Sequence, residues 1–144
     1  MSDLYVVFSV AGADYIVPSA DVIQLESFEG ATPVPGTLPF VAGVVQVRGN
    51  VVPAVDLRIR FGLPTAEHTI DTRVVIVKSG DRHVALIADR AREVVRIESD
   101  RVKPPPAIVA EQAAGFVRAV AQAGPRLFMV LDFEKVIGEE SHAR

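Results

Sequence analysis

Short runs of β-branched and aromatic residues, separated by turns rich in Gly, Pro, Asn and Asp, make up most of this chain. Runs of this kind are typical of β-strands, and the Pro and Gly residues between them end one strand before the next begins. Many short strands with little helix predict an all-β, or mainly β, fold built as barrels or as a sandwich. The predicted strands cover 4–11, 15–17, 21–25, 44–47, 51–55, 73–78, 82–88, 93–97, 116–121 and 126–131.

Two short helical turns interrupt the strands. They are predicted over 57–61 and 133–137, and Asp132 is placed to cap the second one. Residues 104–106 are three consecutive prolines, which favour an extended chain because each Pro disfavours helix in the residue before it.

The hairpin predicted between 44 and 55 contains the most unusual residue of the chain. Its two strands flank the sequence Arg48-Gly49-Asn50, which predicts a three-residue loop because Gly and Asn tolerate positive φ. Arg48 stands between two apolar strands, where a long charged side chain is costly unless it is paired or reaches a surface.

Composition narrows the classes of function. The chain has 144 residues, 49% of them hydrophobic, which is ample for one domain with a sizeable core. Its net charge of -3, with both signs interspersed, argues against nucleic-acid binding by phosphate neutralisation. The absence of cysteine excludes a disulfide framework and fits a reducing cytoplasm. No signal peptide and no membrane-spanning run are expected.

The sequence offers no catalytic constellation, so we expect no enzyme activity and no cofactor. His68, His83 and His142 lack the spacing of a metal site. Asp56 and Asp89 each end a strand, where capping or turning is the commoner role and a general base the less common one. The basic residues at 58 and 60 are interpreted as the solvated face of a short helix. A binding module is therefore the default hypothesis.

A resemblance to the CheW family appears in and around the central hairpin. The matching positions are Pro39, Gly43, Arg48, Gly49, Pro53, Asp56, Leu57, Arg58 and Phe61. The likeness extends over nearly the whole chain, with further matching segments at 8–25, 73–89, 104–106 and 126–137.

The resemblance implies a fold and a function. The fold would be two five-stranded SH3-like β-barrels packed on a shared hydrophobic core, with a short C-terminal helix, forming one CheW-like domain over residues 1–144. The function would be that of a non-catalytic adaptor, coupling chemoreceptors (methyl-accepting chemotaxis proteins) to a CheA-type histidine kinase. Its implied partners are the cytoplasmic tip of a chemoreceptor and the regulatory domain of the kinase, with no nucleic acid and no direct membrane insertion. It would be cytoplasmic and recruited to membrane-associated receptor arrays.

The resemblance also implies where the receptor binds. Arg48 matches the family's receptor-coupling arginine, and the family's receptor groove is lined in part by the apolar segment that here contains Val17, Val22 and Leu25. Arg48 would be a buried organiser of that groove, a polar anchor on its rim, or a fold residue hydrogen-bonded to loop carbonyls. The three apolar residues would line the groove or belong to the core.

Several positions depart from the family pattern and keep other hypotheses open. Gln24 stands where an acidic residue is common, and Gln46-Val47 replaces the usual Asn-Leu before Arg48. One alternative is a CheW-like scaffold that keeps a single partner surface in a pathway controlling pili, gliding or development instead of swimming. A more remote alternative is a barrel that binds a small ligand or nucleic acid, although the few aromatic residues and the negative charge argue against the latter.

Overall fold

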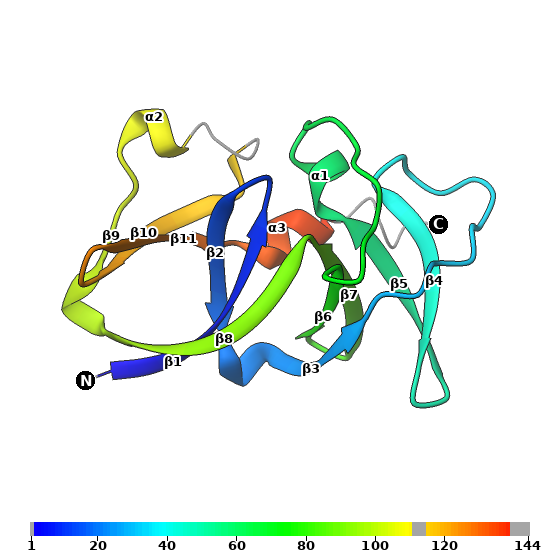
Figure 1. Ribbon diagram of the computed structural model, residues 1–144, viewed down its shortest axis with the longest axis horizontal. Helices are drawn as coiled ribbons and strands as arrows, with labels where there is room; N and C mark the ends of the chain where they lie inside the picture. Colours follow the sequence, from blue (N-terminus) through cyan, green and yellow to red (C-terminus); the bar gives the residue numbers. More distant parts are fainter. Residues whose placement is uncertain (1, 111–114, 139–144) are drawn as a thin grey trace.

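Two β-sheets form two lobes that lie side by side, with a short helix between them (Figure 1). The computed structural model describes residues 2–110 and 115–138. In the first lobe the strand order is β8-β1-β2-β11-β10-β9. Its strands are β1 (Ser2–Val10), β2 (Ala13–Pro18), β8 (Arg90–Glu98), β9 (Val102–Lys103), β10 (Val117–Ala123) and β11 (Arg126–Leu131).

The second lobe is built from the central part of the chain, in the strand order β3-β6-β7-β5-β4. Its strands are β3 (Val22–Ser27), β4 (Val41–Val47), β5 (Asn50–Asp56), β6 (Arg73–Ser79) and β7 (Arg82–Ala88). The helical segments of the described chain are η1 (Ser19–Asp21), α1 (Leu57–Arg60), η2 (Ser99–Arg101), α2 (Ala107–Ala110) and α3 (Phe133–Ile137).

The mainly β fold predicted from the sequence is confirmed. Each predicted strand occurs with small shifts at its ends, while β9 and α2 are additions that the sequence did not predict. Each sheet combines antiparallel pairs with one parallel pair, β2 with β11 and β5 with β7. This layout is compatible with the two barrels that the family resemblance implies, with β9 added to the first. The assignment of residues 1–144 to a single domain stays a prediction.

Three apolar clusters form the core of the protein. One lies within each lobe, and the third is shared between them. On β6, Val74 and Ile76 face the cluster inside the second lobe, whereas Val75 and Val77 face the shared cluster. This strand is thus buried on both faces, which explains why it reads as a continuous apolar run instead of an alternating one. Full burial of each such side chain contributes about 1.5–3 kcal/mol.

Helix α3 connects the two lobes through side chains as well as through the core. Asp132 caps it, accepting a hydrogen bond from the Lys135 amide at 3.1 Å, as the sequence predicts. Arg60, on α1 of the second lobe, donates from Nε to the Val136 carbonyl at 2.7 Å, and its guanidinium lies 4.0 Å from the centre of the Phe40 ring. The interpretation of Arg60 as a solvated residue is therefore wrong. Its cation joins the carbonyl end of α3, where a helix dipole favours positive charge.

Gly43 allows the loop before β4 to lie directly against that strand. Thr32 and Val44 exchange backbone hydrogen bonds of 2.8 and 2.9 Å. A Cβ atom on Gly43 would lie 2.1 Å from the Thr32 carbonyl oxygen, and the φ of Gly43 is 140°. Only glycine fits this close approach without displacing the loop.

Candidate partner-binding surface

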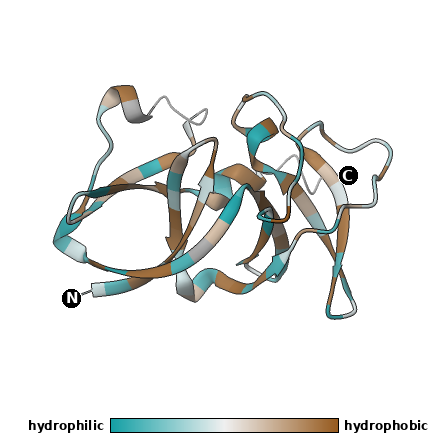
Figure 2. Cartoon of the chain, viewed as in Figure 1, coloured by the Kyte–Doolittle hydropathy of each residue, from teal (hydrophilic) through white to brown (hydrophobic). Residues whose placement is uncertain are grey.

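The turn between β4 and β5 places Arg48 at the tip of a hairpin. Val47 pairs with Asn50, so the loop contains only Arg48 and Gly49, and the predicted three-residue loop is wrong. Both loop residues have positive φ, 50° and 82°, as a type I′ turn requires. This turn matches the right-handed twist of the strands, so pairing continues one residue further than the sequence suggested. In Figure 2 the tip is hydrophilic and the strands leading to it are hydrophobic.

The side chain of Arg48 is exposed and makes no hydrogen bond or ion pair with any residue that the structure describes. The hypothesis of a buried organiser is therefore wrong, and so is that of a fold residue bonded to loop carbonyls. A polar anchor on the rim of a recess is the remaining prediction for Arg48.

Such a recess lies beside Arg48, between the two edge strands of the second sheet. It has a volume of about 250 Å³ and is lined by β3 on one side and by the β4–β5 hairpin on the other. We call it the polar pocket because it contains four polar side chains. Its lining consists of Ile23, Gln24, Val47, Arg48, Asn50, Val52, Ile76 and His83.

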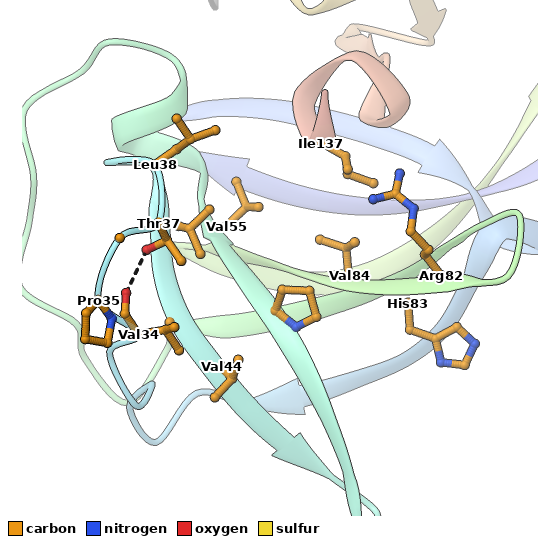
Figure 3. A pocket seen from close by; sticks show the side chains of 14 residues that line it. Val34, Pro35, Thr37, Leu38, Val44, Val55, Arg82, His83, Val84 and Ile137 are labelled. Carbon is orange, nitrogen blue, oxygen red and sulfur yellow. Dashed lines mark hydrogen bonds between the residues drawn. The ribbon is translucent and has the colours of Figure 1, made fainter. Parts of the chain in front are cut away.

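A larger recess, the apolar groove, lies on the neighbouring part of the same lobe, and His83 lines both (Figure 3). Its volume is about 490 Å³. Val44, Val55 and Val84 supply apolar walls, and Ile137 of α3 adds a contribution from between the lobes. The loop before β4 forms another wall, and Thr37 stiffens it by donating a hydrogen bond of 3.0 Å to the Val34 carbonyl. The remaining lining residues are Pro35, Gly36, Leu38, Val41, Gly43, Pro53 and Arg82.

The structure separates the four predicted site residues. Val17 is fully buried in the shared cluster, and Val22 is half-buried against the same cluster. Leu25 is 39% exposed on the outer face of β3, next to Ile23, which is 45% exposed. Among these β3 residues it is Ile23, and not Val22 or Leu25, that joins Arg48 in the polar pocket. The proposed receptor contact of Arg48, Val17, Val22 and Leu25 stays a prediction, and Val17 has no exposed surface in this conformation.

An ion pair that the sequence did not predict lies near the junction of the lobes. Arg58 was interpreted as a solvated residue, but its Nη2 and Nε donate to both oxygens of Asp89, at 2.7 and 3.0 Å. Asp89 also accepts a hydrogen bond of 2.8 Å from the Ala11 amide of the first lobe. Burial alone would raise the pKa of the Asp89 carboxyl, but these hydrogen bonds and the Arg58 charge lower it below its ordinary value. This pair orients α1 and joins it to both sheets.

Asp56 and His68 complete the polar contacts around α1. Asp56 caps α1, which is the commoner of its two predicted roles, by accepting a hydrogen bond from the Arg58 amide at 2.9 Å. His68 Nε2 lies 4.0 Å from the other oxygen of Asp56, and its ring meets the Phe28 ring edge-on at 4.6 Å. The signal in the sequence was the position of Asp56 and Asp89 at strand ends. The cap that Asp56 forms is local, but the partners of Asp89 are 31 and 78 positions away and leave no local pattern.

Within the described residues, no group of three or more His, Cys, Asp or Glu side chains could hold a metal ion. His142 lies outside those residues. No helix among the residues described is long and apolar enough to span a bilayer.

The structure defines a class of protein: a mainly β fold of two sheets around a shared core, with two adjoining recesses on one lobe. Comparison with known proteins is more specific. The model of the CheW-like domain matches residues 4–141, and the chain belongs to that family.

Relatives support this membership along the whole chain. The chemotaxis protein CheW of Bacillus subtilis (strain 168) is 32% identical over 136 residues, which cover 94% of this chain and 87% of that protein. Protein FrzA of Myxococcus xanthus is 32% identical over 125 residues, covering 84% of this chain and 76% of FrzA. The crystal structure of the scaffolding protein TtCheW from Thermoanaerobacter tengcongensis superposes with a TM-score of 0.89 at 27% identity, covering 100% of this chain and 98% of that one.

Proposed function

We propose that this protein is a non-catalytic chemosensory adaptor, which couples a chemoreceptor to a CheA-type histidine kinase by protein–protein contacts. The structural observation that carries the proposal is the apolar groove, whose valine walls are bordered by polar residues such as Arg82 and His83. An amphipathic helix places its apolar face in a groove of this kind and its polar face against the rim. Family membership and the names of the CheW relatives support the same function.

The proposed partners follow from the family. A helix from the cytoplasmic tip of a chemoreceptor would occupy the groove, and the kinase regulatory domain would bind elsewhere on the surface. The protein would then work in the cytoplasm, at membrane-associated receptor arrays, without a cofactor.

The proposal is tested by copurification of a receptor-tip fragment and a kinase regulatory domain from the same organism. Wild-type protein is expected to retain both fragments. Arg48→Glu is expected to lose the receptor fragment and keep the kinase fragment, because it reverses the charge in the polar pocket, which adjoins the apolar groove at His83, without removing a bond seen in the fold. Arg101→Glu, at an exposed position of η2 in the first lobe, is the matched control. Unchanged receptor binding by folded Arg48→Glu protein would refute the role of Arg48.

A second pair of variants tests the groove itself. Val34 borders the groove and is 40% exposed, so Val34→Asp should fold normally while placing a charge where an apolar face would dock. Val94, on β8 of the first lobe, is 53% exposed, and Val94→Asp is the control. We expect at least a roughly tenfold loss of receptor affinity for the first variant alone, because an unpaired charge that loses water on binding costs more than 1.4 kcal/mol. Equal affinities would exclude the groove as the receptor site.

The similarity to FrzA, whose name does not mention chemotaxis, favours a second candidate function. In this candidate the protein is a scaffold that retains one partner surface and serves a pathway controlling pili, gliding or development. Copurification from the parent cell distinguishes the two. Recovery of both a receptor and a kinase establishes the coupling adaptor, whereas recovery of only one partner supports the scaffold.

A further inference from the structure

The polar pocket contains more hydrogen-bond donors than its own residues can use. Gln24, Arg48, Asn50 and His83 line it, and none of their side chains is hydrogen-bonded within the part of the chain described here. From this arrangement we infer that the pocket binds a carboxylate, supplied by an Asp or Glu side chain of a partner protein.

Gln24 gives the clearest indication. Its Nε2 atom is buried and has no hydrogen-bond partner among the described residues. A buried donor left unsatisfied is costly, so native proteins supply an acceptor for nearly all such groups. Gln24 lies on β3 and lines the pocket opposite the β4–β5 hairpin, so a change of its side-chain rotamer would turn this amide toward an acceptor in the pocket.

Charge selects the kind of acceptor. Arg48 brings a full positive charge to the pocket, and no Asp or Glu is among the residues that line it. A guanidinium presents parallel N–H groups that match the two oxygens of a carboxylate. Asn50 and His83 each carry a further donor, so a bound carboxylate could accept from several sides at once.

The backbone of Arg48 is the second independent observation. Its φ of 50° lies in the left-handed region, where non-glycine residues other than Asn and Asp are uncommon and strained. Asn-Gly is the pair that this turn type favours most, and it would avoid the strain. An arginine kept in a strained position, with no bond in the fold, indicates that its side chain acts on something outside the chain.

The surroundings indicate a protein side chain and not a free anion. Exposed apolar residues flank the pocket: Ile23 is 45% exposed, and Val51, which follows Asn50 on β5, is 68% exposed. A free anion would gain nothing from these side chains, whereas an acidic residue with apolar neighbours would cover them. The identification of the chemoreceptor tip as the source of that residue rests on the proposed function; the preference for a carboxylate does not.

The pocket is tested first with a small probe. Protein labelled with ¹⁵N is titrated with sodium acetate, and separately with sodium chloride and sodium phosphate, at pH 7 and equal ionic strength. We expect saturable shifts of the Gln24 side-chain amide and the Arg48 Nε–H with acetate alone. Arg48→Gln should weaken acetate binding by roughly tenfold or more, because the charge-assisted hydrogen bonds of the guanidinium would be lost. Arg101→Gln should leave it unchanged.

Equal shifts with chloride would mean an adventitious ion only and would overturn the proposal. Stronger binding of phosphate than of acetate would also overturn it. Gln24→Glu supplies a carboxylate within the chain, so this variant should shift the Arg48 Nε–H without acetate and lose the response to acetate. If it retained the full response, the assignment would be wrong.

The partner is then tested with the receptor-tip fragment, in which each Asp and Glu is changed singly to Asn or Gln. One such change should weaken binding to the wild-type protein by roughly tenfold, and it should have little further effect on Arg48→Gln, because the same contact is already lost. If acetate binds as expected but no acidic position of the fragment matters, the pocket stands and the receptor is excluded as the source of its carboxylate. If the fragment does not bind at all, the proposed function fails while the acetate result still decides the pocket.

Discussion

Replacement of Arg48 by glycine is expected to make the fold more stable and partner binding weaker. The φ of 50° costs a non-glycine residue about 1–2 kcal/mol. Glycine removes that strain but adds backbone entropy to the unfolded chain, which costs about 0.5–1 kcal/mol. Arg48 makes no bond with the described residues, so no contact of the fold is lost. The net expectation is a gain of about 0.5–1 kcal/mol in the free energy of unfolding.

Urea unfolding of Arg48→Gly and of wild-type protein measures this difference, and a thermal scan should show the midpoint rising by about 2–5 °C for a chain of this size. Gly49→Ala is the matched control at the next position. Its φ is 82° and a Cβ there would meet nothing within 4 Å, so any loss of stability is purely conformational and should be about 1 kcal/mol. A loss of more than about 1 kcal/mol for Arg48→Gly would show that the arginine holds the fold together and would refute the reasoning.

Three further expectations concern the fold. The pKa of Asp89 is lowered in the folded state, so the contribution of this carboxylate to stability is complete above about pH 4 and is lost as pH falls through the folded pKa. Urea unfolding should therefore show Asp89→Asn to be less stable than wild type at pH 7, and this difference should shrink below pH 4. A gap that stays constant down to pH 2 would contradict the ion pair with Arg58. Gly43→Ala should cost about 3 kcal/mol, because the new methyl group overlaps the Thr32 carbonyl, and a wild-type thermal midpoint would refute this. Arg60→Lys should lower the unfolding free energy by about 1–2 kcal/mol, since lysine cannot both stack on an aromatic ring and reach the carbonyls of α3; Arg101→Lys, with no such contacts, should be neutral.

Local sequence patterns predicted the elements of this fold well. Turn residues and β-branched runs located the strands, and Asp132 was identified as a helix cap from its position alone. These features depend on residues a few positions apart, which one sequence displays directly. The error at the β4–β5 turn arose because Asn50 is also a good turn residue, and only the pairing with Val47 shows that it belongs to the strand.

The candidate site was harder to predict because its residues meet across the fold. Gln24 lies on edge strand β3 and Arg48 in the turn that follows edge strand β4, and these two strands are not hydrogen-bonded neighbours in the sheet, so no spacing in the sequence joins the two residues. Arg58 and Asp89 are 31 positions apart. Val17 and Leu25 look alike as apolar strand residues, yet one is fully buried and the other is 39% exposed. A single sequence shows that a strand is apolar, but which face meets solvent depends on what packs against it.

The first sheet combines strands from the two ends of the chain, β1 and β2 with β8 to β11, and this has a consequence for synthesis of the protein. Strands β3 to β7 are consecutive in the chain, so the second sheet can assemble as soon as they have left the ribosome. The first sheet must wait, because β11 lies between β2 and β10 and is among the last strands to be made. Until then Phe8 and Val17, both fully buried in the finished protein, have only part of the shared cluster to cover them. We therefore expect the nascent chain to expose apolar strands until late in translation, a state in which aggregation is favoured.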